Sequence, residues 1–290
     1  MQLSNVLTIV GVGLIGGSIG LAAKRRGLVR TVRGLGRRQS SLDRARALGA
    51  IDEAYLDPQA ALKDAGLVVV CTPVDQIAGQ IVRFASFCKP GAILTDAGST
   101  KATIVAEVEA GLAAHTQERN PVPQVHFVGS HPLAGSEKRG PEFADAELFQ
   151  DRWTVLTPTP RTDAEALEKT KAFWTALGSR VKLMTPQDHD RALALTSHVP
   201  HLVAAALAAS LPAELRELAA TGFRDTTRIA AGDSALWTAI FTHNQDAVLS
   251  ALAAVEARLQ AFRQALAARD WNALGQLLIQ AKEVRDALGS

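Results

Sequence analysis

The sequence predicts an α/β protein in which a doubly wound, mostly parallel sheet is followed by a C-terminal all-α domain. Short apolar runs alternate with helix-like segments in the first part of the chain, as in a parallel sheet with crossover helices. The first of these runs ends in a glycine-rich turn. Beyond Thr185 strand-like runs give way to segments rich in alanine and leucine. We therefore expect two domains, residues 1–184 and 185–290.

The expected elements of the first domain follow its apolar runs. A strand at Val6–Val10 leads into a helix at Leu14–Arg26, and a second strand and helix follow at Thr31–Leu35 and Ser41–Leu48. Consecutive parallel strands of this kind are joined by right-handed crossovers. Further strands are expected at Leu67–Cys71, Ala92–Thr95 and Val125–Val128, with helices that begin near Asp75 and Lys101.

Two more strands, Trp153–Leu156 and Arg180–Met184, flank an expected helix at Asp163–Leu177. Because they continue the same alternation, we expect them to extend the same sheet.

The second domain is expected to be helical over Asp188–Leu211, Ser234–Leu266 and Asp270–Leu288. A helix as apolar as His201–Leu211 needs burial on nearly every face. A helical layer of roughly 100 residues has a thin core. We therefore expect a homodimer that forms through this domain, with Asp188–Leu211 in or beside the subunit contact.

The composition is that of an ordinary globular protein, with 47% hydrophobic residues in 290. Its 31 basic and 29 acidic residues give a net charge of +2, so we expect neither nucleic acid nor a membrane as a partner. Two cysteines, Cys71 and Cys88, cannot build a disulfide framework, which indicates a reducing, cytoplasmic location. The uncharged segment Val6–Ala23 contains five glycines and precedes its basic cluster, so we interpret it as core and not as an export signal.

The glycine-rich turn has the GxGxxG pattern at Gly11, Gly13 and Gly16, between an expected strand and an expected helix. In this Rossmann-type context the glycines allow a tight turn and close approach of the backbone to a pyrophosphate, which binds at the helix N-terminus. The alternative is a turn without a ligand. We expect Leu14 and Ile15 to contact the cofactor with these glycines.

The second strand ends without the carboxylate that usually binds the ribose of NAD. Arg37, Arg38, Ser40 and Ser41 stand there instead, which suits a 2′-phosphate and favours NADP over NAD. The alternative is that both arginines are solvated and that the enzyme uses both cofactors. Thr72 and Pro73, after the strand that ends at Cys71, are also expected to contact the cofactor.

Two further motifs follow expected strands and should open at the same edge of the sheet. Ser99 lies in the segment Asp96–Lys101, where it could cap a helix and also face the nicotinamide. His131 lies in an expected loop that is flanked by glycines. A histidine near neutrality can accept the proton of a hydroxyl group while hydride leaves the same carbon. The alternative is a loop histidine that only binds backbone.

The helical domain contributes two polar motifs, Ser197–His201 and Gly222–Arg228, the second of which we expect to be a loop. His198 and His201 lie three residues apart, a spacing that places them on one side of a helix. Because no third ligand cluster accompanies them, we do not expect a metal site.

In combination and order, these motifs resemble the prephenate and arogenate dehydrogenases of tyrosine biosynthesis. The resemblance covers nearly the whole chain and rests on GVGLIGGS at 11–18, DAGSTK at 96–101, SHPLAGSEKRG at 130–140, SHVPH at 197–201 and GFRDTTRIA at 222–230, with Trp237 beyond.

The resemblance implies an oxidative decarboxylation, in which a hydroxyl-bearing ring carbon gives hydride to the nicotinamide and the ring carboxylate leaves as carbon dioxide. It implies that His131 contacts the ring hydroxyl, that Ser99 orients it, and that Arg228 binds a substrate carboxylate with its planar donor fork. It places five more residues around the substrate: Ser136, Glu137, His201, Asp225 and Trp237.

Two alternatives stay open at this point. One is a hydroxy-acid dehydrogenase on a similar two-domain plan, which would use a helix-borne lysine where this chain has His131. The other is a nicotinamide-sensing protein without turnover, which would need none of His131, Ser99 and Arg228. The sequence also leaves prephenate and arogenate both open, since they differ only in a keto or an amino group.

Overall fold

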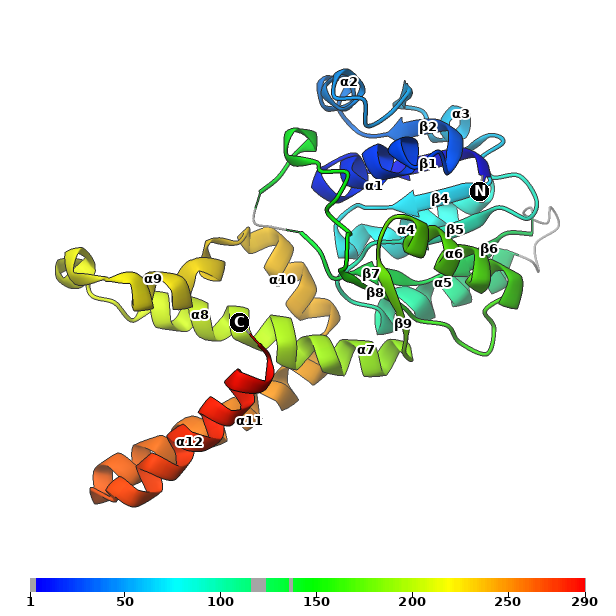
Figure 1. Ribbon diagram of the computed structural model, residues 1–290. Helices are drawn as coiled ribbons and strands as arrows, with labels where there is room; N and C mark the ends of the chain where they lie inside the picture. Colours follow the sequence, from blue (N-terminus) through cyan, green and yellow to red (C-terminus); the bar gives the residue numbers. More distant parts are fainter. Residues whose placement is uncertain (1–3, 116–123, 136–137, 290) are drawn as a thin grey trace.

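The protein is described by a computed structural model that covers residues 4–115, 124–135 and 138–289. It consists of an N-terminal sheet domain and a C-terminal helical domain (Figure 1). Six parallel strands form the main sheet in the order β3-β2-β1-β4-β5-β6, so the predicted Rossmann-type sheet is confirmed. Its elements are β1 (Ser4–Val10), α1 (Leu14–Arg25), β2 (Val29–Leu35), α2 (Gln39–Ala47), β3 (Glu53–Tyr55), α3 (Pro58–Leu62), β4 (Leu67–Val70), α4 (Val74–Ala85), β5 (Ile93–Asp96), α5 (Ala102–His115) and β6 (His126–Val128).

Helices cover both faces of this sheet. Val69 of β4 packs into one apolar cluster with α1, whereas its neighbours Val68 and Val70 pack into a second cluster with α4 and α5. A strand that is buried on both faces reads as a continuous apolar run, which explains why β4 was predicted correctly. The strand order reverses between β1 and β4, which is the position where ligands bind in sheets of this kind.

The prediction that the later strands extend this sheet was wrong. They form a second sheet, in which β7 (Ser130–Pro132) pairs antiparallel with β8 (Trp153–Leu156) and β8 pairs parallel with β9 (Arg180–Leu183). The helix α6 (Ala164–Ala176) connects β8 to β9, and a short 3₁₀ helix (Pro141–Phe143) lies between β7 and β8.

Long-range hydrogen bonds at Ser130 explain the change of sheet. Its backbone N–H donates to the side chain of Asp96, 3.0 Å away, and its hydroxyl donates to the carbonyl oxygen of Asp96. The indole of Trp174 donates to the same hydroxyl at 3.1 Å. Each of these bonds has a side-chain partner, so Ser130 is tied to the end of β5 without joining its backbone ladder. His131 consequently lies on strand β7 and not in a loop.

The helical domain begins with α7 (Pro186–Leu193), a π-helical turn (Ala194–His198) and α8 (Val199–Ala209). By length and composition Pro186–Ala209 could cross a membrane, but a third of its most apolar window (33%) is buried in the protein. The domain continues with a 3₁₀ helix (Ala213–Leu218), α9 (Thr221–Thr227), a 3₁₀ turn (Arg228–Ala231), α10 (Ser234–His243), α11 (Gln245–Ala268) and α12 (Trp271–Ala287).

Two details of this domain differ from the prediction. The segment Gly222–Arg228, expected as a loop, is largely the helix α9. The long helix expected at Ser234–Leu266 is broken at Asn244, whose side-chain amide donates to the backbone carbonyl of Asp190 at 2.8 Å. A polar residue bonded across the domain thus ends one helix and begins the next.

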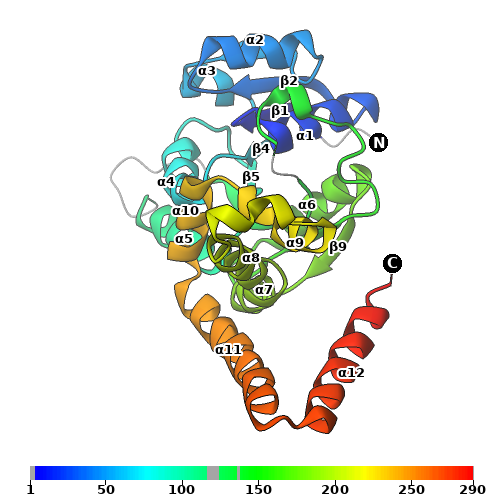
Figure 2. The ribbon, with the colours of Figure 1, turned by 90° about the vertical axis from the view of Figure 1, so that its left-hand side faces the viewer.

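The hairpin of α11 and α12 projects from the rest of the molecule (Figures 1 and 2). No residue of α12 is buried. Large apolar side chains on the hairpin are at least half exposed: Leu249, Leu259, Leu266, Trp271, Leu278, Ile279 and Val284. Segment Asp188–Leu211, by contrast, packs several side chains inward, among them His189, Leu193 and His201.

Candidate active site

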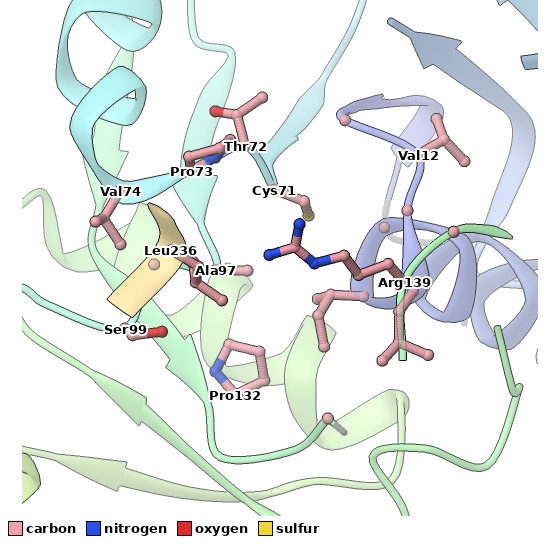
Figure 3. Close-up of a pocket in the computed structure, with 18 of the residues that line it drawn as sticks. Val12, Cys71, Thr72, Pro73, Val74, Ala97, Ser99, Pro132, Arg139 and Leu236 are labelled. Carbon is pink, nitrogen blue, oxygen red and sulfur yellow. The ribbon is translucent and has the colours of Figure 1, made fainter. Parts of the chain in front are cut away.

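A cleft of about 1830 Å³ lies along the carboxyl ends of the parallel strands and reaches the helical domain. Its volume exceeds that of a usual small-molecule pocket and suits a dinucleotide together with a second ligand. Figure 3 shows Ser99 and Pro132 on one side, Cys71 and Thr72 on another, and the Arg139 side chain reaching into the space between them.

The β1–α1 turn forms one end of the cleft and fits a diphosphate. Gly11 has φ +87°, and a Cβ there would lie 3.0 Å from the backbone oxygen of Cys71. A Cβ at Gly16 would lie 2.3 Å from the oxygen of Gly11, so the strand and helix require glycine at both positions. Gly13 precedes α1 as its N-cap and gives it no side-chain cap, and a Cβ there would meet no atom within 4 Å. The helix N-terminus thus faces open space that an anion could fill.

The remaining predicted cofactor residues lie along the same cleft, with one exception. Leu14, Ile15, Arg37, Arg38, Thr72, Pro73 and Ser99 line it. Ser40 is not among the described lining residues, whereas Ser41 and Arg44 are. Ser41 and Arg44 lie three apart in α2 and so share a face of that helix. Arg44 was missed because nothing in the sequence indicates which face of α2 points at the cleft.

Ser99 does not cap the helix that follows it. Helix α5 begins at Ala102, and its N-terminus is capped by Asp190 from α7 of the helical domain. The two carboxylate oxygens accept the backbone N–H groups of Lys101 and Ala102 at 2.7 and 2.8 Å. The serine is half-buried in the cleft wall, so its hydroxyl is available to a ligand.

His131 lies in the cleft wall and is joined to two residues that the sequence analysis missed. Its Nδ1 is 2.8 Å from Nε2 of His189, and the Nδ1 of His189 is 2.7 Å from Oδ1 of Asp190. The imidazole rings of His131 and His189 meet edge to face, with centroids 5.1 Å apart. His189 and Asp190 lie in the first turns of α7. Acidic residues are common there because they interact favourably with the positive end of the dipole of their own helix.

Burial sets the protonation state of His131. It lowers the pKa of the imidazole well below the usual 6.5, and the positive charge of Lys101 acts in the same direction. The ammonium group of Lys101 is itself fully buried and paired with the carboxylate of Asp96. His131 is therefore neutral near pH 7 and can accept a proton.

The helical domain supplies the other wall. Arg228 and Trp237 line the cleft, together with Ser197 and His198. His201 lies behind Trp237 and stacks on its indole, with ring centroids 3.6 Å apart and an interplanar angle of 13°. Burial lowers the pKa of His198 to about 4, so this imidazole is neutral as well.

Of the remaining predicted substrate residues, the structure places one outside the cleft. Asp225 is exposed on α9 and is not among the described lining residues of the cleft. Ser136 and Glu137 lie outside the described residues. Beyond them Arg139 forms an ion pair with Asp233 at 2.6 Å, which links the sheet domain to the start of α10 across the cleft. Within the described residues no group of three or more His, Cys, Asp or Glu side chains could hold a metal ion.

Comparisons with known proteins agree with this geometry. Residues 19–183 match the family model of the prephenate dehydrogenase nucleotide-binding domain, and residues 185–280 match that of the prephenate dehydrogenase dimerization domain. The chain is 35% identical to a cyclohexadienyl dehydrogenase of Zymomonas mobilis, over 97% of this chain and 95% of that protein.

Two crystal structures resemble the fold closely. Prephenate dehydrogenase from Aquifex aeolicus, in complex with hydroxyphenyl propionate and NAD⁺, superposes with a TM-score of 0.88 at 30% identity over 99% of this chain and 98% of that one. Arogenate dehydrogenase from Synechocystis gives 0.80 at 32% identity, over 98% and 99% of the two chains. The chain therefore belongs to the prephenate dehydrogenase family, whose members carry out NAD(P)-dependent oxidative decarboxylation in tyrosine biosynthesis.

Proposed function

We propose that the protein oxidises prephenate, arogenate or both with a preference for NADP, and that His131 is the general base. The observation that carries this proposal is a buried, neutral imidazole in the wall of a cleft that Ser99 and, from the helical domain, Arg228 also line. Membership of the prephenate dehydrogenase family argues against a hydroxy-acid dehydrogenase. A sensor without turnover would need none of His131, Ser99 and Arg228.

In the proposed reaction His131 takes the proton of the ring hydroxyl while Ser99 holds that hydroxyl in place. A bound nicotinamide supplies the hydride acceptor. As the C–H bond of the hydroxyl-bearing carbon breaks, the bond to the ring carboxylate also breaks, carbon dioxide leaves, and its electron pair completes the aromatic ring. Arg228 binds a carboxylate of the substrate, and the indole of Trp237 packs beside it.

Steady-state kinetics with both substrates and both cofactors test the proposal. We expect turnover of prephenate or arogenate with kcat/KM higher for NADP than for NAD. Absence of turnover with both prephenate and arogenate would contradict the proposed activity. The ratio of kcat/KM for prephenate to kcat/KM for arogenate assigns the preferred substrate.

Cofactor choice should depend on the arginines after β2. We expect the double change Arg37→Ala and Arg38→Ala to remove most of the preference for NADP, since each charge-assisted contact contributes about 1.5–3 kcal/mol. The loss in kcat/KM for NADP should be about 100-fold or more, while kcat/KM for NAD changes little. Arg30→Ala, on β2 but outside the cleft lining, is the matched control. Equal efficiency of the unmodified enzyme with both cofactors would contradict the NADP proposal.

We propose that the active form is a homodimer that buries the α11–α12 hairpin. The matching family model is a dimerization domain, and exposed apolar side chains gather on these two helices. Light scattering should give twice the chain mass of 30.7 kDa at low micromolar concentration. Leu278→Arg with Ile279→Arg should shift the mass toward the monomer, whereas Leu48→Arg on the sheet domain, at 49% exposure, should not. A stable wild-type monomer would contradict the proposal.

A further inference from the structure

The three residues His131, His189 and Asp190 form a continuous hydrogen-bonded chain that crosses from the sheet domain to the helical domain. His131 comes from β7, whereas the other two come from the start of α7. All three side chains are buried, and the imidazole of His189 is fully so. A buried polar chain of this kind fixes the orientation of each member, because any other arrangement leaves a polar atom without a partner.

The direction of the chain follows from its end at Asp190. Its carboxylate accepts two backbone N–H groups at the start of α5, those of Lys101 and Ala102, so it also acts as the acceptor toward Nδ1–H of His189. A neutral imidazole carries one proton, so the Nε2 of His189 is an acceptor. It therefore accepts Nδ1–H of His131 at 2.8 Å. The proton of His131 is held at Nδ1, and its Nε2 keeps a lone pair for a substrate proton.

We propose that His189, held by Asp190, is a positioning residue that fixes His131 in the tautomer required of the base. This inference rests on the proposed role of His131 and extends it to two residues outside every motif that identified the site. In serine proteases a buried aspartate orients the catalytic histidine in the same way, and a change that gives the wrong tautomer lowers kcat by about 10⁴-fold.

Among the residues that the structure describes, the other polar groups that face His189 are bonded elsewhere. Lys101 and Asp96 face it from the β5–α5 connection, but their charged groups are paired with each other. His198 faces the cluster from the π-helical turn and is engaged at Nδ1 by the side chain of Asn244, 3.1 Å away. The same Asn244 also binds the backbone of Asp190, so the junction between α10 and α11 supports helix α7 beside His189.

Two substitutions separate a positioning role from a packing role. In His189→Gln the amide oxygen can still accept Nδ1–H of His131, whereas in His189→Leu no acceptor is left. We expect kcat to fall about 10-fold in the glutamine variant and about 100-fold or more in the leucine variant, with KM for substrate and cofactor within about threefold of wild type. If His189 only filled space, the loss of kcat would be larger in the glutamine variant than in the leucine variant, because leucine is the milder change in a buried site.

Controls make the result specific. His126→Gln alters a histidine on β6 outside the cleft lining and should leave kcat unchanged. Melting temperatures are measured for every variant, and if the leucine variant does not fold, the glutamine variant alone decides. A kcat within about threefold of wild type in His189→Leu, an unchanged kcat in His189→Gln, or a larger loss in Gln than in Leu would overturn the proposal. His131→Asn is assayed in parallel: normal activity there would overturn the base assignment itself, whereas loss there with normal His189 variants would overturn only the positioning role.

Discussion

Replacing His131 by asparagine should lower kcat by about 100-fold or more, because the reaction then lacks the group that takes the hydroxyl proton. The Kd of the cofactor should stay within about twofold of the wild-type value, since we expect the dinucleotide to bind mainly at the β1–α1 turn and the end of β2, which line the cleft. Steady-state kinetics give the first quantity and fluorescence titration with the reduced cofactor gives the second. His126→Asn serves as the control. Near-normal turnover of His131→Asn would remove this residue from the base role.

The pH dependence of the wild-type enzyme provides an independent check. Burial lowers the pKa of His131 below 6.5, so the imidazole stays neutral as the pH falls from 8 through 6.5. Because kcat/KM reports the free enzyme, it should remain flat over this range and decline only at lower pH, when His131 becomes protonated. An acid limb at or above pH 6.5 would contradict a buried base.

The parts of the fold that could be predicted are those with local signals. The apolar run of β4 and the glycine turn before α1 can each be predicted from a few consecutive residues. The short strand β3 and helix α3 carry too few residues to show a pattern. The split into two sheets could not be predicted, since it depends on bonds between Ser130 and Asp96, which lie 34 residues apart.

The same distinction holds in the active site. His131 and Ser99 were found because each follows a strand in a recognisable motif. Asp190 was missed because a carboxylate in the first turns of a helix is normally explained by its own helix. Here it caps a different one, α5, 88 residues earlier in the chain. Only the packing of the two domains brings this carboxylate and His189 into hydrogen-bond contact with His131.

Arg228→Ala should weaken substrate binding more than any other single change on the helical side of the cleft. The residue begins the 3₁₀ turn after α9 and lines the cleft on the domain opposite the dinucleotide turn. Its removal leaves a substrate carboxylate desolvated without a partner, a loss of about 2–5 kcal/mol. That loss corresponds to an increase in KM of roughly 30-fold to several thousand-fold, with KM for the cofactor unchanged.

Arg228→Lys should recover only part of this loss, because an ammonium group keeps the charge but not the bidentate fork. Arg224→Ala, one turn earlier on α9, is the matched control, since Arg224 is exposed and binds the backbone oxygen of Ala219. Thermal melts distinguish substrate binding from support of the fold. An unchanged melting temperature with a much higher KM for substrate agrees with a binding role. A large fall in melting temperature with a normal KM would instead make Arg228 part of the scaffold of the helical domain.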